Sequence, residues 1–264
     1  MKFREIFRFE FVYQAHRVRT WLYFAVLFII EYLLNRTAGS GDVHLHSQYD
    51  IAQETILTSL LWVLMAPAVA GSAAARDVHT RMRPLVYTTP IRKADYLGGR
   101  FLAAFLLNAL ILLAVPLGML AALLLPGKDH AIVAARPAVY LASYGVLALP
   151  TAFTFTAVQF LVAALKRRAS VSYLGSVLFF IPVSIVAALV TNVLHMPTLG
   201  TLLDPTNRIT VLVLIPETLT PLEQETVLAG LEGAILANRL LWIGVALAIL
   251  AFTHARFRLD QREG

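Results

Sequence analysis

Four long stretches without a charged residue constrain the fold of this chain more than any other feature. They are Ile56–Ala75, Phe101–Leu125, Pro137–Leu165 and Ala169–Leu194. An α-helix needs about 20 apolar residues to cross a hydrocarbon layer of about 30 Å, and each stretch is long enough. Lipid offers the backbone no hydrogen-bond partner, so helices are expected. The sequence therefore predicts an all-α membrane protein.

Two weaker stretches complete the predicted set of about six transmembrane helices, with five or seven as the alternatives. One lies near Thr20–Asn35 and carries Glu31, and the other lies near Leu240–Ala255 and is short. Since Glu31 falls near the outer end of its span, we expect it to reach water at the membrane surface.

The composition agrees with a single membrane domain over residues 1–264. Only 14% of the residues are charged, against about 25% in soluble domains, so the polar side chains are too few to cover a soluble protein. The chain has no cysteine, which excludes disulfides and thiolate metal sites. No internal repeat or shift in composition marks a second domain.

The distribution of Lys and Arg predicts the orientation. Residues 1–19, 76–100, 166–168 and 256–264 hold 17 of the 22 basic residues, and these segments share one side of a six-span topology. The positive-inside rule places that side, with both termini, in the cytoplasm. The net charge of +6 thus lines a membrane face, and we expect no nucleic-acid partner.

The first 19 residues predict a helix that lies in the inner membrane interface. Phe3, Ile6, Phe7 and Phe11 recur at near-helical spacing among charged residues. The alternative is a cytoplasmic extension of the first span.

The outer segment 195–238 is the longest connection between predicted spans. It contains two apolar pieces, Ile209–Ile215 and Leu222–Leu236, which are too short to span a bilayer. We expect short re-entrant or surface helices here, because backbone within lipid must satisfy its own hydrogen bonds.

The sequence lacks the motifs of an enzyme. It has no G-x-x-x-x-G-K-[ST] loop and no H-E-x-x-H, and no set of catalytic residues can be assembled. His44 and His46 could ligate a metal on the outer face, but such pairs are usually solvated, and we predict no metal site and no cofactor bound by this chain.

Polar residues within the fourth and fifth predicted spans form a candidate substrate path: Thr151, Thr154, Gln159 and Ser176. The alternative is that these side chains hydrogen-bond between helices, which is the commoner role of such residues. The spacing Gly99-x-x-x-Ala103 would also let two helices approach closely, within the chain or across a dimer.

The basic segment 76–96 between the second and third spans is the most informative part of the sequence, and we call it the elbow segment. Pro84 should begin or break a short helix, and Thr89-Pro90 is typical of the start of the next one. A short charged helix at the inner face suits docking of a soluble partner. The alternative is an ordinary basic loop that serves only topology.

The residues in and around the elbow segment resemble those of type-2 ABC transporter permeases. The likeness comprises the small residues of Gly71–Ala75, the pairs Arg76-Asp77 and Thr80-Arg81, the turn Thr88–Ile91, and Asp95–Ala104. Within that family, the chain is most similar to the N-terminal part of bacterial permease–aminopeptidase fusion proteins. It departs from many members at Arg76-Asp77 and His79-Thr80, where they carry a Glu-Arg or Glu-Glu pair and a Gly-Thr step.

The resemblance implies a permease of the bacterial inner membrane. It also implies three partners: a separate ABC ATPase, a second permease unit and membrane lipid. ATP and magnesium would bind to the ATPase, and the transporter would be an exporter. The resemblance assigns the coupling contacts to Arg76, Asp77, Thr80, Arg81, Arg83, Pro84, Thr89 and Pro90. The alternative function is a non-transporting scaffold that anchors a soluble partner.

Overall fold

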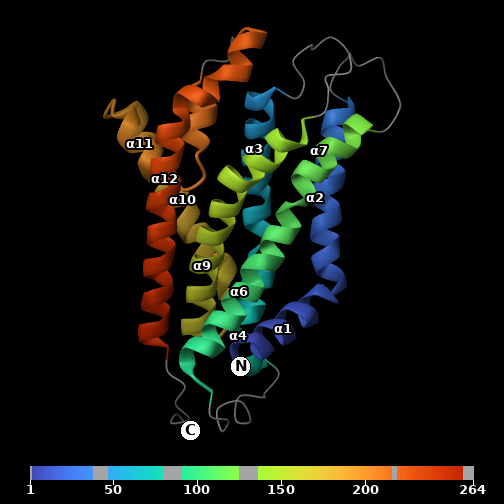
Figure 1. Cartoon of the computed structure of the whole chain (residues 1–264). Coiled ribbons are helices and arrows are strands. Elements are labelled where there is room, and N and C mark those ends of the chain that lie inside the picture. Colours follow the sequence, from blue (N-terminus) through green and yellow to red (C-terminus); the bar gives the residue numbers. More distant parts are fainter. Residues whose placement is uncertain (1, 38–46, 80–90, 125–135, 216–218, 258–264) are drawn as a thin grey trace.

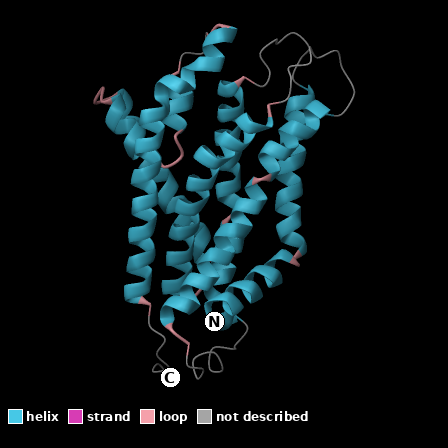
Figure 2. Ribbon diagram, viewed as in Figure 1, coloured by secondary structure: helices cyan, strands magenta, loops and turns pink. Residues whose placement is uncertain are grey.

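The computed structural model describes residues 2–37, 47–79, 91–124, 136–215 and 219–257, and the regular structure in these ranges is helical (Figures 1 and 2). Six helical stretches in this part of the chain are long and apolar enough to cross a membrane, as the sequence predicts. They are Val18–Arg36, Gln48–Asp77, Lys93–Leu123, Pro137–Lys166, Val171–Asn192 and Leu222–Arg256.

The N-terminal helix α1 (Lys2–Ala15) is separate from α2 (Val18–Thr37). The chain turns between them, and the Thr20 hydroxyl donates to the Gln14 carbonyl at 2.8 Å across the corner. Figure 1 shows α1 crossing the base of the bundle obliquely, while α2 runs along it. A continuous extension of the first span is therefore wrong, and placement of α1 in the membrane interface stays a prediction.

Helix α1 packs closely on α6 (Lys93–Leu112) because two glycines leave room for it. A Cβ atom at Gly99 would lie 3.1 Å from Ile6 Cγ2 and from the Phe7 backbone nitrogen. The small face of Gly99 is thus occupied by α1 of the same chain, so it is not open to a second copy.

The last four residues of the elbow segment form the first turn of α6, which begins at Lys93. Ile91 and Arg92 are not helical, so the start predicted at Thr89-Pro90 is wrong by about one turn. Asp95 lies in the first turn of α6, where a negative charge is favourable to the helix dipole. This acidic residue marks the start better than the preceding proline does.

Prolines divide two of the spans. The second span consists of α3 (Gln48–Met65) and α4 (Pro67–His79), and the third of α6 and α7 (Ala114–Leu124). A proline inside a helix lacks an N–H group and crowds the carbonyl four residues earlier. Pro67 and Pro116 account for the two breaks.

The fourth span contains α8 (Pro137–Ser143), a π-helical turn η1 (Tyr144–Ala148) and α9 (Leu149–Lys166). The wide turn ends two residues before Pro150, which cannot donate to the carbonyl of Val146. Helix α10 (Val171–Asn192) forms the fifth span and tolerates Pro182 within it.

The last span differs from its prediction. After α11 (Pro197–Leu203) and the π turn η2 (Ile209–Val213), helix α12 runs unbroken over Pro221–Arg256. Thr220 and Glu223 form a capping box at its start. The separate outer helix Leu222–Leu236 and the short sixth span are one helix of about 54 Å, longer than a bilayer core is thick.

Helix α9 lies at the centre of the bundle and packs against α4, α6, α10 and α12. The main core includes Trp62, Phe101, Phe155 and Phe160, with Phe101 and Phe160 edge to face at 5.7 Å. Figure 1 shows α1 and the last turn of α12 at the same end of the bundle. We call this the terminal end and the opposite one the far end.

Candidate functional site: the base of the elbow and a buried arginine

The elbow segment is described only at its two ends. Six of its eight predicted coupling residues lie outside the described residues: Thr80, Arg81, Arg83, Pro84, Thr89 and Pro90. The other two, Arg76 and Asp77, are 8% and 6% exposed. Their side chains therefore face the protein interior.

Arg76 ties the end of α4 to α1. Its guanidinium forms an ion pair with Glu10, which is 1% exposed, and it stacks over the Tyr13 ring at 3.6 Å from the centroid. The Gln14 amide donates to the same carboxyl group at 2.7 Å. Burial raises the pKa of Glu10 above its ordinary value, although Arg76 acts in the opposite direction.

Asp77 ties the end of α4 to the start of α6. It forms an ion pair with Arg100 and accepts a hydrogen bond from the Tyr96 hydroxyl at 2.6 Å. Arg100 also donates to the Ala73 carbonyl at 3.1 Å and lies over the Tyr96 ring at 4.4 Å. The Tyr96 ring in turn stacks on the Phe257 ring, with 5.8 Å between the centroids. Phe257, which directly follows α12, therefore contacts the same group of residues.

These contacts form one buried polar cluster, which we call the elbow clamp: Glu10, Gln14, Arg76, Asp77, Tyr96 and Arg100. Both ends of the elbow segment are fastened within it. Sequence reasoning missed Glu10, Tyr96 and Arg100 as site residues. The available signals were an acid among the aromatic residues of the N-terminal helix and an arginine at the start of an uncharged stretch.

The predicted substrate-path residues are buried and hydrogen-bonded between helices. Gln159 donates to the Ser176 hydroxyl at 2.7 Å, which joins α9 to α10. Thr154 donates to the Trp242 carbonyl on α12 at 3.3 Å. Thr151 faces α12 as well, where it accepts from Arg239. The structure thus brings these residues to two helix interfaces, and a path role stays a prediction.

Arg239 is a buried cation within the last span, although the sequence suggested that it belongs to an outer segment. It lies 17 residues before Arg256, about 25 Å along the helix, and is 3% exposed. It donates to the Thr151 hydroxyl at 2.9 Å and more weakly to the Leu147 carbonyl at 3.4 Å. The distance from Arg256 places Arg239 toward the outer side of a hydrocarbon layer about 30 Å thick, and a buried arginine within a membrane helix usually marks function.

The charge of Arg239 is only indirectly balanced. Asp204 attracts it, but the carboxylate of Asp204 accepts from Thr206 and from the Ile209 backbone amide instead. The Nε and Nη2 atoms of Arg239 have no hydrogen-bond partner among the residues that the structure describes. This buried guanidinium therefore has spare hydrogen-bond donors.

Glu31 is also buried, so the expectation that it reaches water is wrong. It is 0% exposed and accepts a hydrogen bond from Thr58 of α3. The Glu54 carboxyl lies nearby and accepts from Asn35 at 2.9 Å. The reason is local packing: a Cβ atom at Gly118 of α7 would lie 2.8 Å from Glu31 Cβ, so α7 covers this face of α2.

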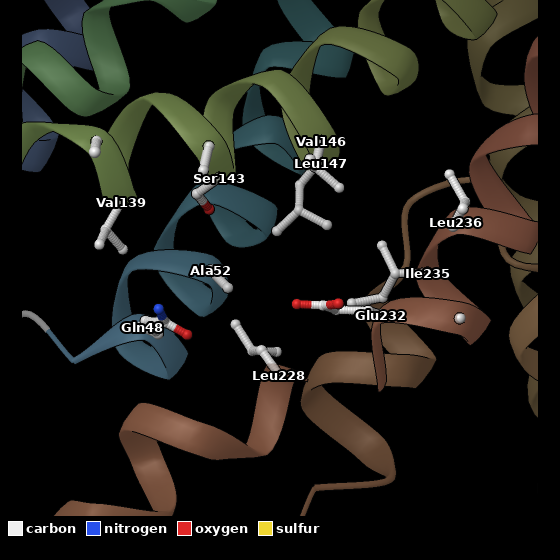
Figure 3. A pocket seen from close by; sticks show the side chains of 13 residues that line it. Gln48, Ala52, Val139, Ser143, Val146, Leu147, Leu228, Glu232, Ile235 and Leu236 are labelled. Atoms are coloured by element: carbon white, nitrogen blue, oxygen red, sulfur yellow. The ribbon is translucent and has the colours of Figure 1, made fainter. Parts of the chain in front are cut away.

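A cavity of about 690 Å³ opens at the far end between α3, the α8–η1 stretch and α12 (Figure 3). Its walls are mainly aliphatic, with Leu147 and Val146 opposite Leu228 and Ile235. Figure 3 shows the Glu232 carboxylate pointing into it. An apolar cavity with a few polar groups is the usual form of a small-molecule site.

Within the described ranges, no group of His, Asp and Glu side chains could hold a metal ion. His44 and His46 lie outside those ranges. In comparisons with known proteins, no family model matches the chain, and no match is found among curated proteins.

Proposed function

We propose that this chain is the membrane-spanning permease subunit of an ATP-driven exporter, coupled to a separate ABC ATPase through the elbow segment. The proposal rests on the family resemblance in residues 71–104 and on the six candidate spans. The observation that carries it is the elbow clamp. A segment that transmits movement from a partner must be rigidly attached to the membrane helices that it moves.

The clamp meets this requirement physically. Arg76 and Asp77 are consecutive, yet one is paired with α1 and the other with α6. A load on residues between 77 and 96 would therefore move α1, α4 and α6 together. In this mechanism, ATP-driven closure of the ATPase pair shifts the elbow, and the helices rock to change access. Two permease units, identical or different, would complete the transporter.

The orientation belongs to the same proposal. The terminal end carries Arg17, Arg19 and the run Lys166–Arg168, besides the clamp arginines. By the positive-inside rule this end faces the cytoplasm of a bacterial cell, with the chain in the inner membrane. ATP and magnesium would bind to the partner, which is cytoplasmic.

The experiment tests co-purification of the full chain with candidate ABC ATPase subunits from the same organism. The variant combines Arg81→Glu with Pro90→Ala, and Arg208→Glu at the far end serves as the matched charge reversal. The elbow variant should lose co-purification and stimulation of ATP hydrolysis in proteoliposomes, and the control should keep both. If the elbow variant keeps both, the coupling assignment is wrong.

The alternative is a scaffold that anchors a partner without transport. The basic face at the terminal end would suit it equally well. Transport separates the two functions: a scaffold would form the complex, yet ATP hydrolysis in proteoliposomes would move no solute across the membrane.

A further inference from the structure

The unsatisfied guanidinium of Arg239 stands apart from the elbow and its proposed role. It is 3% exposed, and its Nε and Nη2 atoms lack a partner among the described residues. Buried N–H groups that remain unpaired are costly, and a guanidinium presents them in a fork that matches an oxyanion. The nearest counter-charge, Asp204, is already occupied by the backbone amide of Ile209 and by Thr206.

The far-end cavity is lined by residues next to Arg239, although Arg239 is not itself a lining residue. The side chain of Leu147 lines the cavity, while the backbone carbonyl of the same residue accepts from Arg239. Ile235 and Leu236 also line it, and they precede Arg239 by four and three residues on α12. Residues at this spacing share one helix face, so Arg239 continues the cavity wall toward the interior.

We propose that Arg239 binds the oxyanion head group of an amphipathic ligand, whose hydrocarbon chain occupies the cavity between α3, η1 and α12. The aliphatic walls suit a hydrocarbon chain, and the spare donors suit a carboxylate or phosphate. Glu232 points into the cavity two turns before Arg239, about 10 Å along the helix. Its negative charge disfavours the reverse arrangement, with the head group at the outer end.

The ligand could enter from the surface of the bundle. Val146 and Leu236 are 47% and 60% exposed although both line the cavity. The wall between α8–η1 and α12 is therefore open on the outside. An amphipathic anion dissolved in the outer leaflet or held in a micelle would reach the cavity by this side.

The test is equilibrium binding of radiolabelled dodecyl phosphate to the purified full chain in maltoside micelles, with protein-free micelles as background. Two comparison ligands are measured in the same way: dodecanol, which has the hydrocarbon chain without the charge, and inorganic phosphate, which has the charge without the hydrocarbon chain. We expect Arg239→Gln to weaken binding of dodecyl phosphate by about tenfold or more, because it removes charge-assisted hydrogen bonds. Arg208→Gln, a matched change outside the cavity, should leave binding unchanged.

A second variant tests the cavity independently of the arginine. Gly233 lines the cavity, and a Cβ atom there would meet nothing within 4 Å, so the backbone position accepts a side chain and Gly233→Leu takes up space in the cavity. Leucine also favours a helix more than glycine does, which protects the fold. This variant should bind dodecyl phosphate about tenfold more weakly as well, because the chain loses its space.

Three outcomes would overturn the proposal. Binding that is unchanged in both Arg239→Gln and Gly233→Leu would remove the site. Dodecanol binding as tightly as dodecyl phosphate would exclude recognition of the head group, and inorganic phosphate binding as tightly would exclude the hydrocarbon chain. The assay needs no ATPase, so its failure is distinguishable from failure of the elbow proposal, which co-purification tests.

Discussion

Neutralising one member of the Asp77–Arg100 pair should destabilise the protein strongly. The two side chains are 8% and 7% exposed, so solvent screens their charges little. Loss of one partner from a buried pair costs about 3–5 kcal/mol, since it leaves an uncompensated charge. In Arg100→Gln, the Tyr96 hydroxyl still donates to Asp77 at 2.6 Å and offsets part of the loss. We therefore expect about 3 kcal/mol, at the lower end of that range.

Thermal unfolding in micelles measures this effect. At about 2–4 °C per kcal/mol, the melting temperature should fall by roughly 6–12 °C in Arg100→Gln. Asp77→Asn should lose a similar amount, because the hydrogen bond to the Ala73 carbonyl would be the one that Arg100 keeps with the described residues. The double variant should be less destabilised than the sum of the two, with a coupling energy of about 2 kcal/mol.

The control is Arg208→Gln at the far end, which exchanges the same residue types at a partly exposed position and should shift the melting temperature little. The reasoning would be refuted if either single variant of the pair lost less than about 2 °C, the range expected of an ordinary surface substitution. It would also be refuted if the two losses were additive, since the charges would then not be coupled.

Three further predictions concern single contacts. Gly118→Ala should lower the melting temperature, because its Cβ would lie 2.7 Å from the Phe28 carbonyl oxygen. In the control Gly230→Ala the new Cβ meets no atom within 4 Å, so this variant should raise stability by up to about 1 kcal/mol. The pKa of Glu10 is raised in the folded protein, so its contribution to stability is fully present below pH 4.5 and is lost as the pH rises through the raised pKa. Melting temperatures measured over a pH series should therefore change less in Glu10→Gln than in the unmodified protein. Ser176→Ala should cost about 0.6 kcal/mol, the mean for such bonds in membranes, and unchanged transport by this variant would argue against a path role.

The sequence predicted the spans because the bilayer thickness sets a minimum length for apolar helices. Each of the six predicted stretches corresponds to a helical stretch that is long and apolar enough to span. The separate helix α1 could also be predicted from its aromatic spacing. Boundaries were less accurate, as at Lys93, where the start depends on local capping rather than on hydropathy.

The elbow clamp could not be predicted from residue spacing. Glu10 and Arg76 are 66 positions apart, and their pairing depends on α1 folding back across the base onto α6. That fold-back is made possible by Gly98 and Gly99, whose missing side chains leave space for Phe3 and Ile6. The charges were visible in the sequence, but the close approach of the helices that joins them was not.

The sequence prediction placed Arg239 outside the sixth span for a related reason: an arginine between two apolar pieces normally indicates the boundary of a span. Helix α12 can continue through Arg239 because the fourth span supplies hydrogen-bond acceptors beside the guanidinium. There the chain widens into the π turn η1 ahead of Pro150, and the Leu147 carbonyl and Thr151 hydroxyl both turn toward the guanidinium. The same turn contributes Val146 and Leu147 to the cavity wall. One proline-induced irregularity therefore both holds the buried cation and shapes the space beside it, which agrees with the frequent occurrence of π turns at functional sites.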